Sequence, residues 1–211
     1  MLKRTSAVLL LMVAIFLYCS NPIVPAIINT QPQSKVVVVG DSIEFTVIVT
    51  SYSGPTYQWL KKNIPILGDT NATYTISSVT INDFGEYKVI VSNSRYFSLT
   101  QKSDTSDPIT LTEYVPPAIT TQPQPSTVND SSTVYFSVYA TGNPAPSYQW
   151  QRSSDSLTWT DIAGATNTDY SFLARLTDSG AFFRAVATNV TDTRNAIPVS
   201  VNSDGAKLTV N

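Results

Sequence analysis

Tyr57-Gln58-Trp59 recurs along the chain as Tyr148-Gln149-Trp150, and each copy is followed by an Asp-x-Gly and then by an Asn. The first Asp-x-Gly is Asp83-Phe84-Gly85 and the second is Asp178-Ser179-Gly180. The copies are 91 residues apart at the Tyr-Gln-Trp and 95 apart at the Asp-x-Gly. A separation that grows slowly indicates small loop insertions in two copies of one module. A period this long indicates tandem domains rather than a solenoid.

The composition favours two small β-rich domains. A length of 211 residues, divided by the repeat, gives two domains of roughly 90 residues each. Charged residues make up 13% of the chain and the net charge is −2, while Ser, Thr, Val and Tyr are abundant. Such a mixture favours strands. It does not supply the basic face that a nucleic-acid partner requires, so we expect no nucleic acid among the partners.

The absence of histidine removes several kinds of chemistry. No Ser-His-Asp or Cys-His nucleophile and no His-bearing zinc site can be built. The single cysteine excludes an intrachain disulfide, so both modules must be held together by core packing. A catalytic carboxylate pair remains formally available, but most acids lie at turns or in the Asp-x-Gly motif, where turn bonding explains them. We therefore expect no enzyme, no cofactor and no metal site.

The N-terminal residues 1–19 have the pattern of a signal peptide. Lys3-Arg4 is followed by an apolar run from Ala7 to Tyr18, which at 1.5 Å per residue reaches only about 18 Å, too short for a hydrocarbon core of about 30 Å. The chain's single cysteine, Cys19, follows directly. This arrangement resembles a bacterial lipoprotein signal, which implies a bacterial source, lipid acylation at Cys19 and location at the outer membrane or cell surface.

A second interpretation of the leader stays open. Lipoprotein signals prefer a small residue before the cysteine, and Tyr18 is large. An ordinary signal peptide cut near Cys19 or Ser20 would leave a freely secreted protein.

Period-two alternation of apolar residues predicts short strands and an all-β fold. One face of each such strand faces a core and the other faces water. The alternation is clearest at Ile43, Phe45, Val47 and Val49, and at Val134, Phe136, Val138 and Ala140. We place the two domains at residues 26–113 and 118–211. The intervening Glu113–Pro117 contains paired prolines, which predict a semi-rigid extended spacer.

The order and spacing of these motifs resemble immunoglobulin-like domains, and the second copy is similar to bacterial immunoglobulin-like repeats. The resemblance covers about residues 26–211 and implies two tandem β-sandwiches, here without disulfides. The residues that carry it are Gly40–Val47, Tyr57–Trp59 and Asp83–Asn93 in the first copy, and Pro146–Gln151, Trp159–Ala165 and Asp178–Gly180 in the second.

The resemblance assigns scaffold roles to several residues. Trp59 and Trp150 would be the buried tryptophans that pack between the sheets. Tyr87 takes the place of the tyrosine whose hydroxyl bonds to backbone at the sheet corner, and Phe183 stands at the matching place without a hydroxyl.

The family's paired cysteines have apolar replacements in both copies. They would fall at Val47 and Val89 in the first copy and, allowing one inserted residue, at Val138 and Ala185 in the second. Because Ala185 is small, we expect the second copy to pack less fully there unless the inserted residue brings in a compensating side chain.

Two loops carry candidate ligand contacts. Trp159 lies in a polar stretch and would either stack on a sugar ring, anchor a protein contact or pack as part of an ordinary strand. Tyr96 and Phe97 lie in the predicted loop between the last two strands of the first copy, where exposed aromatics would form a binding hot spot. One of the two would alternatively begin the final strand.

These observations favour a non-catalytic protein of the cell envelope or the extracellular space. It would present two immunoglobulin-like modules for protein–protein adhesion or assembly, with an unidentified surface protein as partner. That hypothesis predicts an exposed apolar patch at loops or an edge strand, where strand addition is one mode of contact. The alternatives are a carbohydrate-binding surface protein, which predicts Trp159 or Tyr96 open beside polar groups, and a pure structural spacer, which predicts neither.

Overall fold

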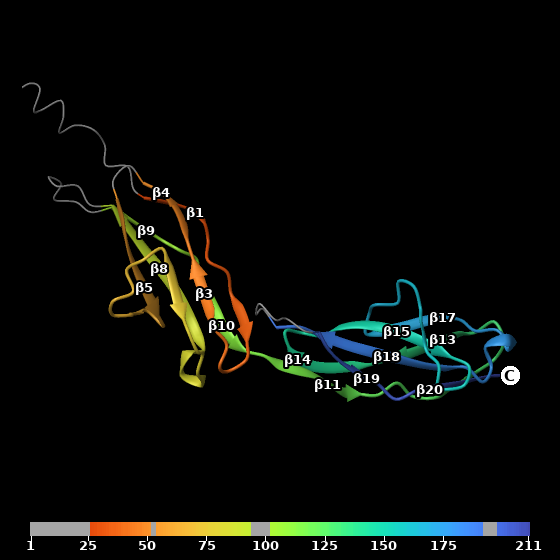
Figure 1. Ribbon diagram of the computed structural model, residues 1–211. Coiled ribbons are helices and arrows are strands. Elements are labelled where there is room, and N and C mark those ends of the chain that lie inside the picture. Colours follow the sequence, from red (N-terminus) through yellow and green to blue (C-terminus); the bar gives the residue numbers. More distant parts are fainter. Residues whose placement is uncertain (1–25, 52–53, 94–101, 192–197) are drawn as a thin grey trace, which may run out of the picture. The chain divides into compact units, whose positions relative to one another are not determined.

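A computed structural model of the chain describes residues 26–51, 54–93, 102–191 and 198–211. The described residues form two β-sandwiches in tandem (Figure 1), so the all-β fold class predicted from the sequence is confirmed. We call strands β1 to β10 module 1 and strands β11 to β20 module 2. The predicted lipidation residue Cys19 and the candidate contacts Tyr96 and Phe97 lie outside the described residues.

Module 1 consists of a small layer and a large sheet. The small layer holds the antiparallel pairs β1–β4 and β3–β7, and the large sheet has the order β2-β10-β8-β5-β6, with β9 also paired to β8. Its elements are β1 (Ile27–Thr30), β2 (Lys35–Val37), β3 (Ile43–Thr46), β4 (Ile48–Thr50), β5 (Pro55–Lys61), β6 (Ile64–Pro65), β7 (Thr73–Ile76), the 3-10 turn η1 (Ile81–Asp83), β8 (Gly85–Asn93), β9 (Lys102–Thr105) and β10 (Ile109–Glu113).

Module 2 repeats this arrangement strand for strand. Its small layer holds β11–β14 and β13–β17, and its large sheet has the order β12-β20-β18-β15-β16, with β19 also paired to β18. Its elements are β11 (Val115–Thr121), β12 (Ser126–Val128), β13 (Thr133–Ser137), β14 (Tyr139–Asn143), β15 (Ser147–Ser153), β16 (Thr160–Asp161), β17 (Asp169–Leu173), η2 (Leu176–Asp178), β18 (Phe182–Asn189), β19 (Val199–Asn202) and β20 (Ala206–Val210).

The paired prolines do not form the polyproline spacer that we expected. Pro116 and Pro117 lie within β11, which begins at Val115 and pairs with β14 from Val115 opposite Asn143. The register shifts between Val115 and Ala118. Proline cannot donate to a strand ladder and is tolerated at such irregular or edge positions.

The Asp-x-Gly motif forms the corner between the two layers. In module 1 the Asp83 carboxylate accepts hydrogen bonds from the Thr80 backbone N (2.8 Å) and the Thr80 hydroxyl (2.7 Å), and Gly85 follows with a φ of 142°. In module 2 the Asp178 carboxylate accepts from the backbone N three residues earlier (2.9 Å), and Gly180 has a φ of 91°. A positive φ of this kind favours glycine. The motif is therefore structural in both modules.

Both motif tryptophans are fully buried and hydrogen-bonded. The indole N–H of Trp59 donates to the Asn71 carbonyl (2.9 Å), and that of Trp150 donates to the Asn167 carbonyl (2.9 Å). Each indole thus packs between the layers while its polar atom is satisfied, as a buried tryptophan requires.

The glutamine before each tryptophan also has a backbone role. Gln58 Nε2 donates to the carbonyls of Trp59 and Ile66, both at 2.9 Å. Gln149 Nε2 makes the same pair of bonds in module 2, reaching the Ile162 carbonyl at 2.8 Å. The Tyr-Gln-Trp repeat therefore couples the core tryptophan to the neighbouring short strand at the sheet edge.

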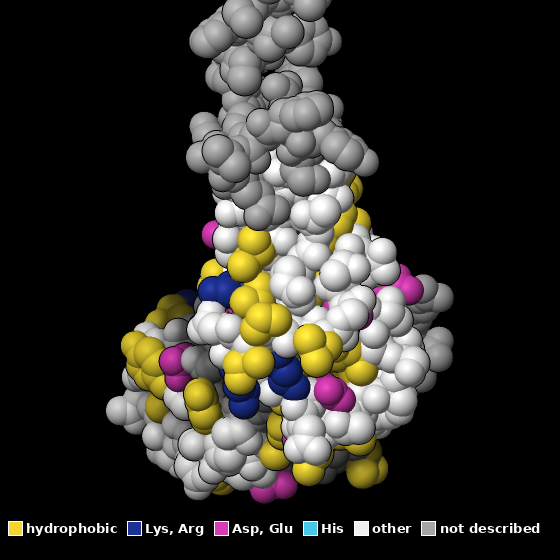
Figure 2. Space-filling view, turned by 90° about the vertical axis from the view of Figure 1, so that its left-hand side faces the viewer, with side chains coloured by type: hydrophobic (Ala, Val, Ile, Leu, Met, Phe, Trp, Pro, Cys, Tyr) yellow, Lys and Arg dark blue, Asp and Glu magenta, His cyan; other side chains and the backbone are white. Residues whose placement is uncertain are grey.

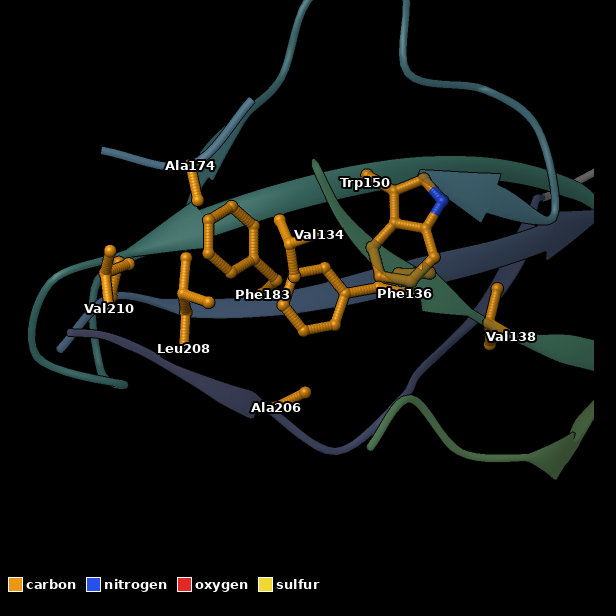
Figure 3. Close-up of a cluster of buried hydrophobic side chains, with 11 residues drawn as sticks. Val134, Phe136, Val138, Trp150, Ala174, Phe183, Ala206, Leu208 and Val210 are labelled. Carbon is orange, nitrogen blue, oxygen red and sulfur yellow. The ribbon is translucent and has the colours of Figure 1, made fainter. Parts of the chain in front are cut away.

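The core of module 2 is a cluster of aromatic and aliphatic side chains (Figure 3). Phe136 lies between Trp150 and Phe183, with ring centroids 6.3 and 4.9 Å away. Ala185 is fully buried next to this cluster. Burial of such aromatic side chains dominates the stability of a small core.

The core of module 2 also receives a large aromatic side chain from β17. Phe172 packs on Phe183 with a centroid distance of 5.2 Å. The corresponding residue of module 1, two places after a tyrosine in β7, is Ile76. A larger ring on β17 thus stands where module 1 has a smaller aliphatic side chain.

A buried serine is repeated beside Val89 and Ala185, the places to which the resemblance assigns the second cysteine. Ser106 Oγ accepts from the Val89 backbone N (3.0 Å), and Ser203 Oγ accepts from the Ala185 backbone N (2.9 Å). Both serines are almost fully buried. Each hydroxyl satisfies a buried N–H that would otherwise lack a partner.

A repeated glutamine fixes the residue after each serine. Gln31 Oε1 accepts from the Asp107 backbone N (3.1 Å), and Gln122 Oε1 accepts from the Asp204 backbone N (2.8 Å). These contacts give a structural role to the glutamine of the Thr-Gln-Pro that precedes the second strand of each module.

Candidate functional site

The short edge strand of module 1 carries exposed apolar side chains that module 2 lacks. Ile64 is 69% exposed and Leu67 is 94% exposed. Ile66 and Ile162 occupy equivalent places, because each donates its backbone N–H to the carbonyl of the motif tryptophan (2.9 Å in both). Counting from these two residues, Thr160 and Ala163 of module 2 match Ile64 and Leu67 of module 1. We call Ile64–Leu67 the β6 edge. Since the backbone arrangement is shared, folding alone does not account for apolar residues at these exposed places.

The β6 edge is built to resist pairing with another strand. Ile66 N donates inward to the Trp59 carbonyl, and successive N–H groups along a strand point to opposite edges. The backbone N of Pro65 therefore faces outward, where proline has no hydrogen to donate. Proline at an exposed edge blocks strand addition.

The face shown in Figure 2 has hydrophobic side chains in several separate groups, and its charged side chains are few and dispersed. This sparseness agrees with a chain of which 13% is charged. Single exposed apolar side chains scattered over a surface are normal. Two of them on one short edge are therefore more informative than the total number of exposed apolar side chains.

The connection between β15 and β16 forms an ordered loop. It contains the six residues 154–159, whereas residues 62 and 63 alone connect β5 to β6. The Asp155 carboxylate accepts from Leu157 N (2.9 Å), Thr158 N (2.8 Å) and Ser153 Oγ (2.8 Å). These hydrogen bonds favour the charged form and lower the pKa of Asp155 to about 2.

The same loop ends on Trp159, which is half-buried. The Arg184 guanidinium lies over its ring, 4.3 Å from the centroid, a favourable cation–π arrangement. A Cβ placed on Gly205 would lie 3.0 Å from Trp159 Cη2, so the ring edge packs closely on that glycine. Partial burial lowers the pKa of Arg184. One ring face of Trp159 is thus covered by Arg184, and one ring edge lies against Gly205.

An open groove of about 560 Å³ lies between this loop and the corner that contains η2. Ser154, Thr158 and Thr160 line it on the loop side and Thr177 lines it on the corner side, all four being exposed. The sequence did not indicate the groove, because its two walls are about 20 residues apart in the chain and neither carries a recognisable motif.

Two charged side chains in the groove are held in place. Arg152 Nη2 lies 2.8 Å from Asp178 Oδ1, and Asp161 Oδ1 accepts from Gln151 Nε2 at 2.8 Å. Trp159 is not among the lining residues.

The sequence-predicted residues do not converge on one site. Val47, Val89 and Tyr87 are buried in module 1, and Val138 and Ala185 are buried in module 2. They lie in the cores, whereas Trp159 packs at the surface of module 2. Within the described ranges, no group of three or more His, Cys, Asp or Glu residues is placed to hold a metal ion. Over the same ranges, no helix has the length and apolarity needed to cross a bilayer.

Comparison with protein families finds a match in each part of the chain. Residues 25–93 match the immunoglobulin domain family. Residues 102–204 match a family described as a domain of unknown function, DUF8696.

Several curated proteins are similar in sequence to part of this chain. Human hemicentin-1 is 25% identical over 167 residues, which is 75% of this chain and 3% of hemicentin-1. The rat netrin receptor DCC is 25% identical over 171 residues, which is 75% of this chain and 11% of the receptor. Endoglucanase C of Cellulomonas fimi is 36% identical over 94 residues, which is 44% of this chain and 8% of the enzyme. The chain thus spans a small fraction of the length of each of these three relatives.

Among solved structures, the complex of Dpr2 Ig1-Ig2 with DIP-Theta Ig1-Ig3 matches 88% of this chain and 66% of the compared chain, with a TM-score of 0.51 and 16% identity. At that identity the likeness concerns the fold alone. With the strand order of both modules and the family match to residues 25–93, it shows that this chain has the fold of two tandem immunoglobulin-like sandwiches.

Proposed function

We propose that this protein is a non-catalytic recognition protein of the cell envelope, and that module 1 binds a protein partner through the β6 edge. The observation that carries the proposal is the contrast between the modules. Ile64 and Leu67 are exposed where module 2 has Thr160 and Ala163 on the same backbone arrangement. Exposed apolar side chains that serve no folding role are typical of interaction sites.

The mode of contact follows from Pro65. Since the outward edge lacks a donor at that residue, the partner would be held by burial of the Ile64 and Leu67 side chains rather than by strand addition. Lys62 flanks the edge on one side and Asp69 on the other, so the edge has a polar rim around an apolar centre, as protein interfaces commonly do.

The relatives support recognition as the general activity. By their printed names, the netrin receptor DCC is a receptor, and Dpr2 was solved in complex with DIP-Theta. Immunoglobulin-like folds host many functions, so the proposal rests on the β6 edge and not on the fold. Neither the lining of the groove nor the motif residues supply a nucleophile with its base, and we propose no catalytic activity.

Location at the envelope is part of the proposal and rests on residues 1–19. Acylation at Cys19 would hold the modules at the membrane surface of a bacterial cell. The test is fractionation of cells that produce the protein or its Cys19→Ser variant. Wild-type protein in the membrane fraction and variant protein in the medium would support the anchor. Wild-type protein that is already free in the medium would favour secretion instead.

The binding proposal is tested by photo-crosslinking on producing cells, with a photoreactive amino acid at Lys62 next to the β6 edge. We expect one discrete protein adduct, and we expect it to be lost when Ile64 and Leu67 are both replaced by Asp. The matched control replaces Thr160 and Ala163 of module 2 by Asp, which should leave the adduct unchanged. No adduct at Lys62, or an adduct that survives the Ile64→Asp and Leu67→Asp changes, would contradict the proposal.

A further inference from the structure

We propose that the groove of module 2 binds a neutral carbohydrate, with its exposed hydroxyls and the Asp161 carboxylate as the recognising groups. This inference goes beyond protein recognition by module 1 and does not rest on it. It concerns a different module, a different surface and a different class of ligand.

The groove exists because module 2 has a longer loop than module 1. Six residues connect β15 to β16, while two residues with positive φ, Lys62 and Asn63, make the tight turn between β5 and β6. The additional residues form one wall of the groove, and the corner with Thr177 forms the other. Loop insertion into a repeated scaffold is a common way in which a fold acquires a binding site.

The wall is held in place by interactions within the chain. Three hydrogen bonds to the Asp155 carboxylate fix the middle of the loop, and Trp159 holds its end under Arg184. A loop that is already ordered loses little conformational entropy when it binds, which increases affinity. Trp159 therefore acts as an anchor for the groove wall and not as a stacking platform.

The lining selects the class of ligand. The lining carries the hydroxyls of Ser154, Thr158, Thr160 and Thr177, and a hydroxyl can both donate and accept a hydrogen bond. The Thr158 side chain also bonds to Asp155 within the loop. One oxygen of Asp161 accepts from Gln151, and a carboxylate has a second oxygen that can accept from a ligand hydroxyl. Ligand hydroxyl groups match such a surface well, and a volume of about 560 Å³ is in the range of small-molecule sites.

Charge disfavours an anionic ligand. Arg152 is the cationic residue of the lining, and it is already paired with Asp178 at 2.8 Å, while Asp161 adds a further negative charge. A phosphate or other anion would meet the Asp161 carboxylate, which repels it, and a guanidinium that is already engaged. Polar and apolar atoms contribute about equally to the exposed lining, which disfavours a wholly apolar ligand.

The test is an NMR titration of the purified full chain with four neutral probes, namely cellotriose, maltotriose, mannotriose and triacetylchitotriose, and with inorganic phosphate for comparison. We expect at least one saccharide to shift the amide signals of Ser154, Thr158 and Thr177, with a Kd of about 0.1–1 mM, a weak affinity that suits an open site. Phosphate should shift them less than that saccharide does.

Two variants make the test specific. Asp161→Asn together with Thr177→Val should weaken saccharide binding by about tenfold or more. The matched control, Asp204→Asn, removes an exposed carboxylate of module 2 outside the groove and should leave the Kd unchanged. Four saccharides that leave these amides unshifted would overturn the proposal. So would an unchanged Kd in the double variant, or a stronger response to phosphate. The crosslinking experiment at the β6 edge tests the protein-binding proposal for module 1, and its outcome does not affect the carbohydrate proposal for module 2.

Discussion

Ser203→Ala should destabilise module 2 out of proportion to the single oxygen atom that it removes. Ser203 Oγ accepts from the Ala185 backbone N at 2.9 Å and donates to the Asp204 carbonyl at 3.1 Å. Ser203 is 6% exposed and Ala185 is fully buried, so water has little access to the amide that loses its partner. The substitution leaves a buried N–H without an acceptor.

The expected cost follows from that orphaned donor. A buried donor without a partner costs about 1–3 kcal/mol, whereas the methyl group that replaces the hydroxymethyl creates almost no cavity. In a domain of this size each kcal/mol lowers Tm by about 4–8 °C, so a loss of about 2 kcal/mol lowers it by about 8–16 °C. Ser106→Ala should have the same effect on module 1, because Ser106 Oγ accepts from the Val89 backbone N at 3.0 Å.

The assay is differential scanning calorimetry of the full chain, in which the affected module should unfold at a lower temperature. Ser200→Ala is the matched control in module 2. Its Oγ lies 2.7 Å from Thr188 Oγ1 at an exposed site, where water can replace it, so its effect should stay within about 0.5 kcal/mol. If Ser203→Ala also changes the free energy of unfolding of module 2 by less than about 0.5 kcal/mol, the structural role assigned to the buried hydroxyl is refuted.

Three further predictions concern module 2. The pKa of Asp155 is lowered to about 2 from its ordinary value of 3.8, so its hold on the loop is complete above pH 3.8 and is lost as the pH falls through 2. The protection of the Leu157 and Thr158 amides against hydrogen exchange, measured by NMR relative to an unfolded peptide at the same pH, should therefore persist at pH 3.8 and fall near pH 2; protection that is already half lost at pH 3.8 would contradict the lowered pKa. Gly205→Ala should displace the Trp159 ring, because the new Cβ would lie 3.0 Å from Trp159 Cη2. The fluorescence of Trp159 should then shift to the red, and an unchanged spectrum would contradict the close packing. Trp150→Ala should lower the free energy of unfolding by about 3–5 kcal/mol, measured by urea denaturation, because the indole is fully buried. A loss below about 1 kcal/mol would argue against the core position of Trp150.

The fold was predictable because its signals recur. The Tyr-Gln-Trp and Asp-x-Gly motifs appear twice in the same order, and Ile43, Phe45 and Val47 alternate as a strand with one buried face should. The structure adds what each motif does, such as the Asp83 carboxylate closing the corner onto Thr80. The spacer predicted from Pro116 and Pro117 was wrong, because pairing of β11 with β14 overrides the local preference of proline.

The binding surfaces were less accessible to sequence analysis. Serine is common in loops, so nothing in the chain marks Ser203 as buried. Ile64 and Leu67 look like ordinary core residues until the neighbouring strands show that they face outward. The groove depends on side chains that meet only in space, with Thr158 on one wall and Thr177 on the other. A periodic pattern shows which face is apolar but not which distant loops lie side by side.

The central claim, that the β6 edge is the recognition surface, is tested most directly by measuring how tightly the crosslinked partner binds a chain with exchanged edge residues. The variant Ile64→Thr, Pro65→Asp, Leu67→Ala gives module 1 the edge that module 2 carries at Thr160, Asp161 and Ala163. Burial of an exposed Leu or Ile contributes about 1.5–3 kcal/mol, so the Kd should rise by about a hundredfold or more. A Kd within about threefold of the wild-type value, in a variant whose melting temperature is unchanged, would contradict the account.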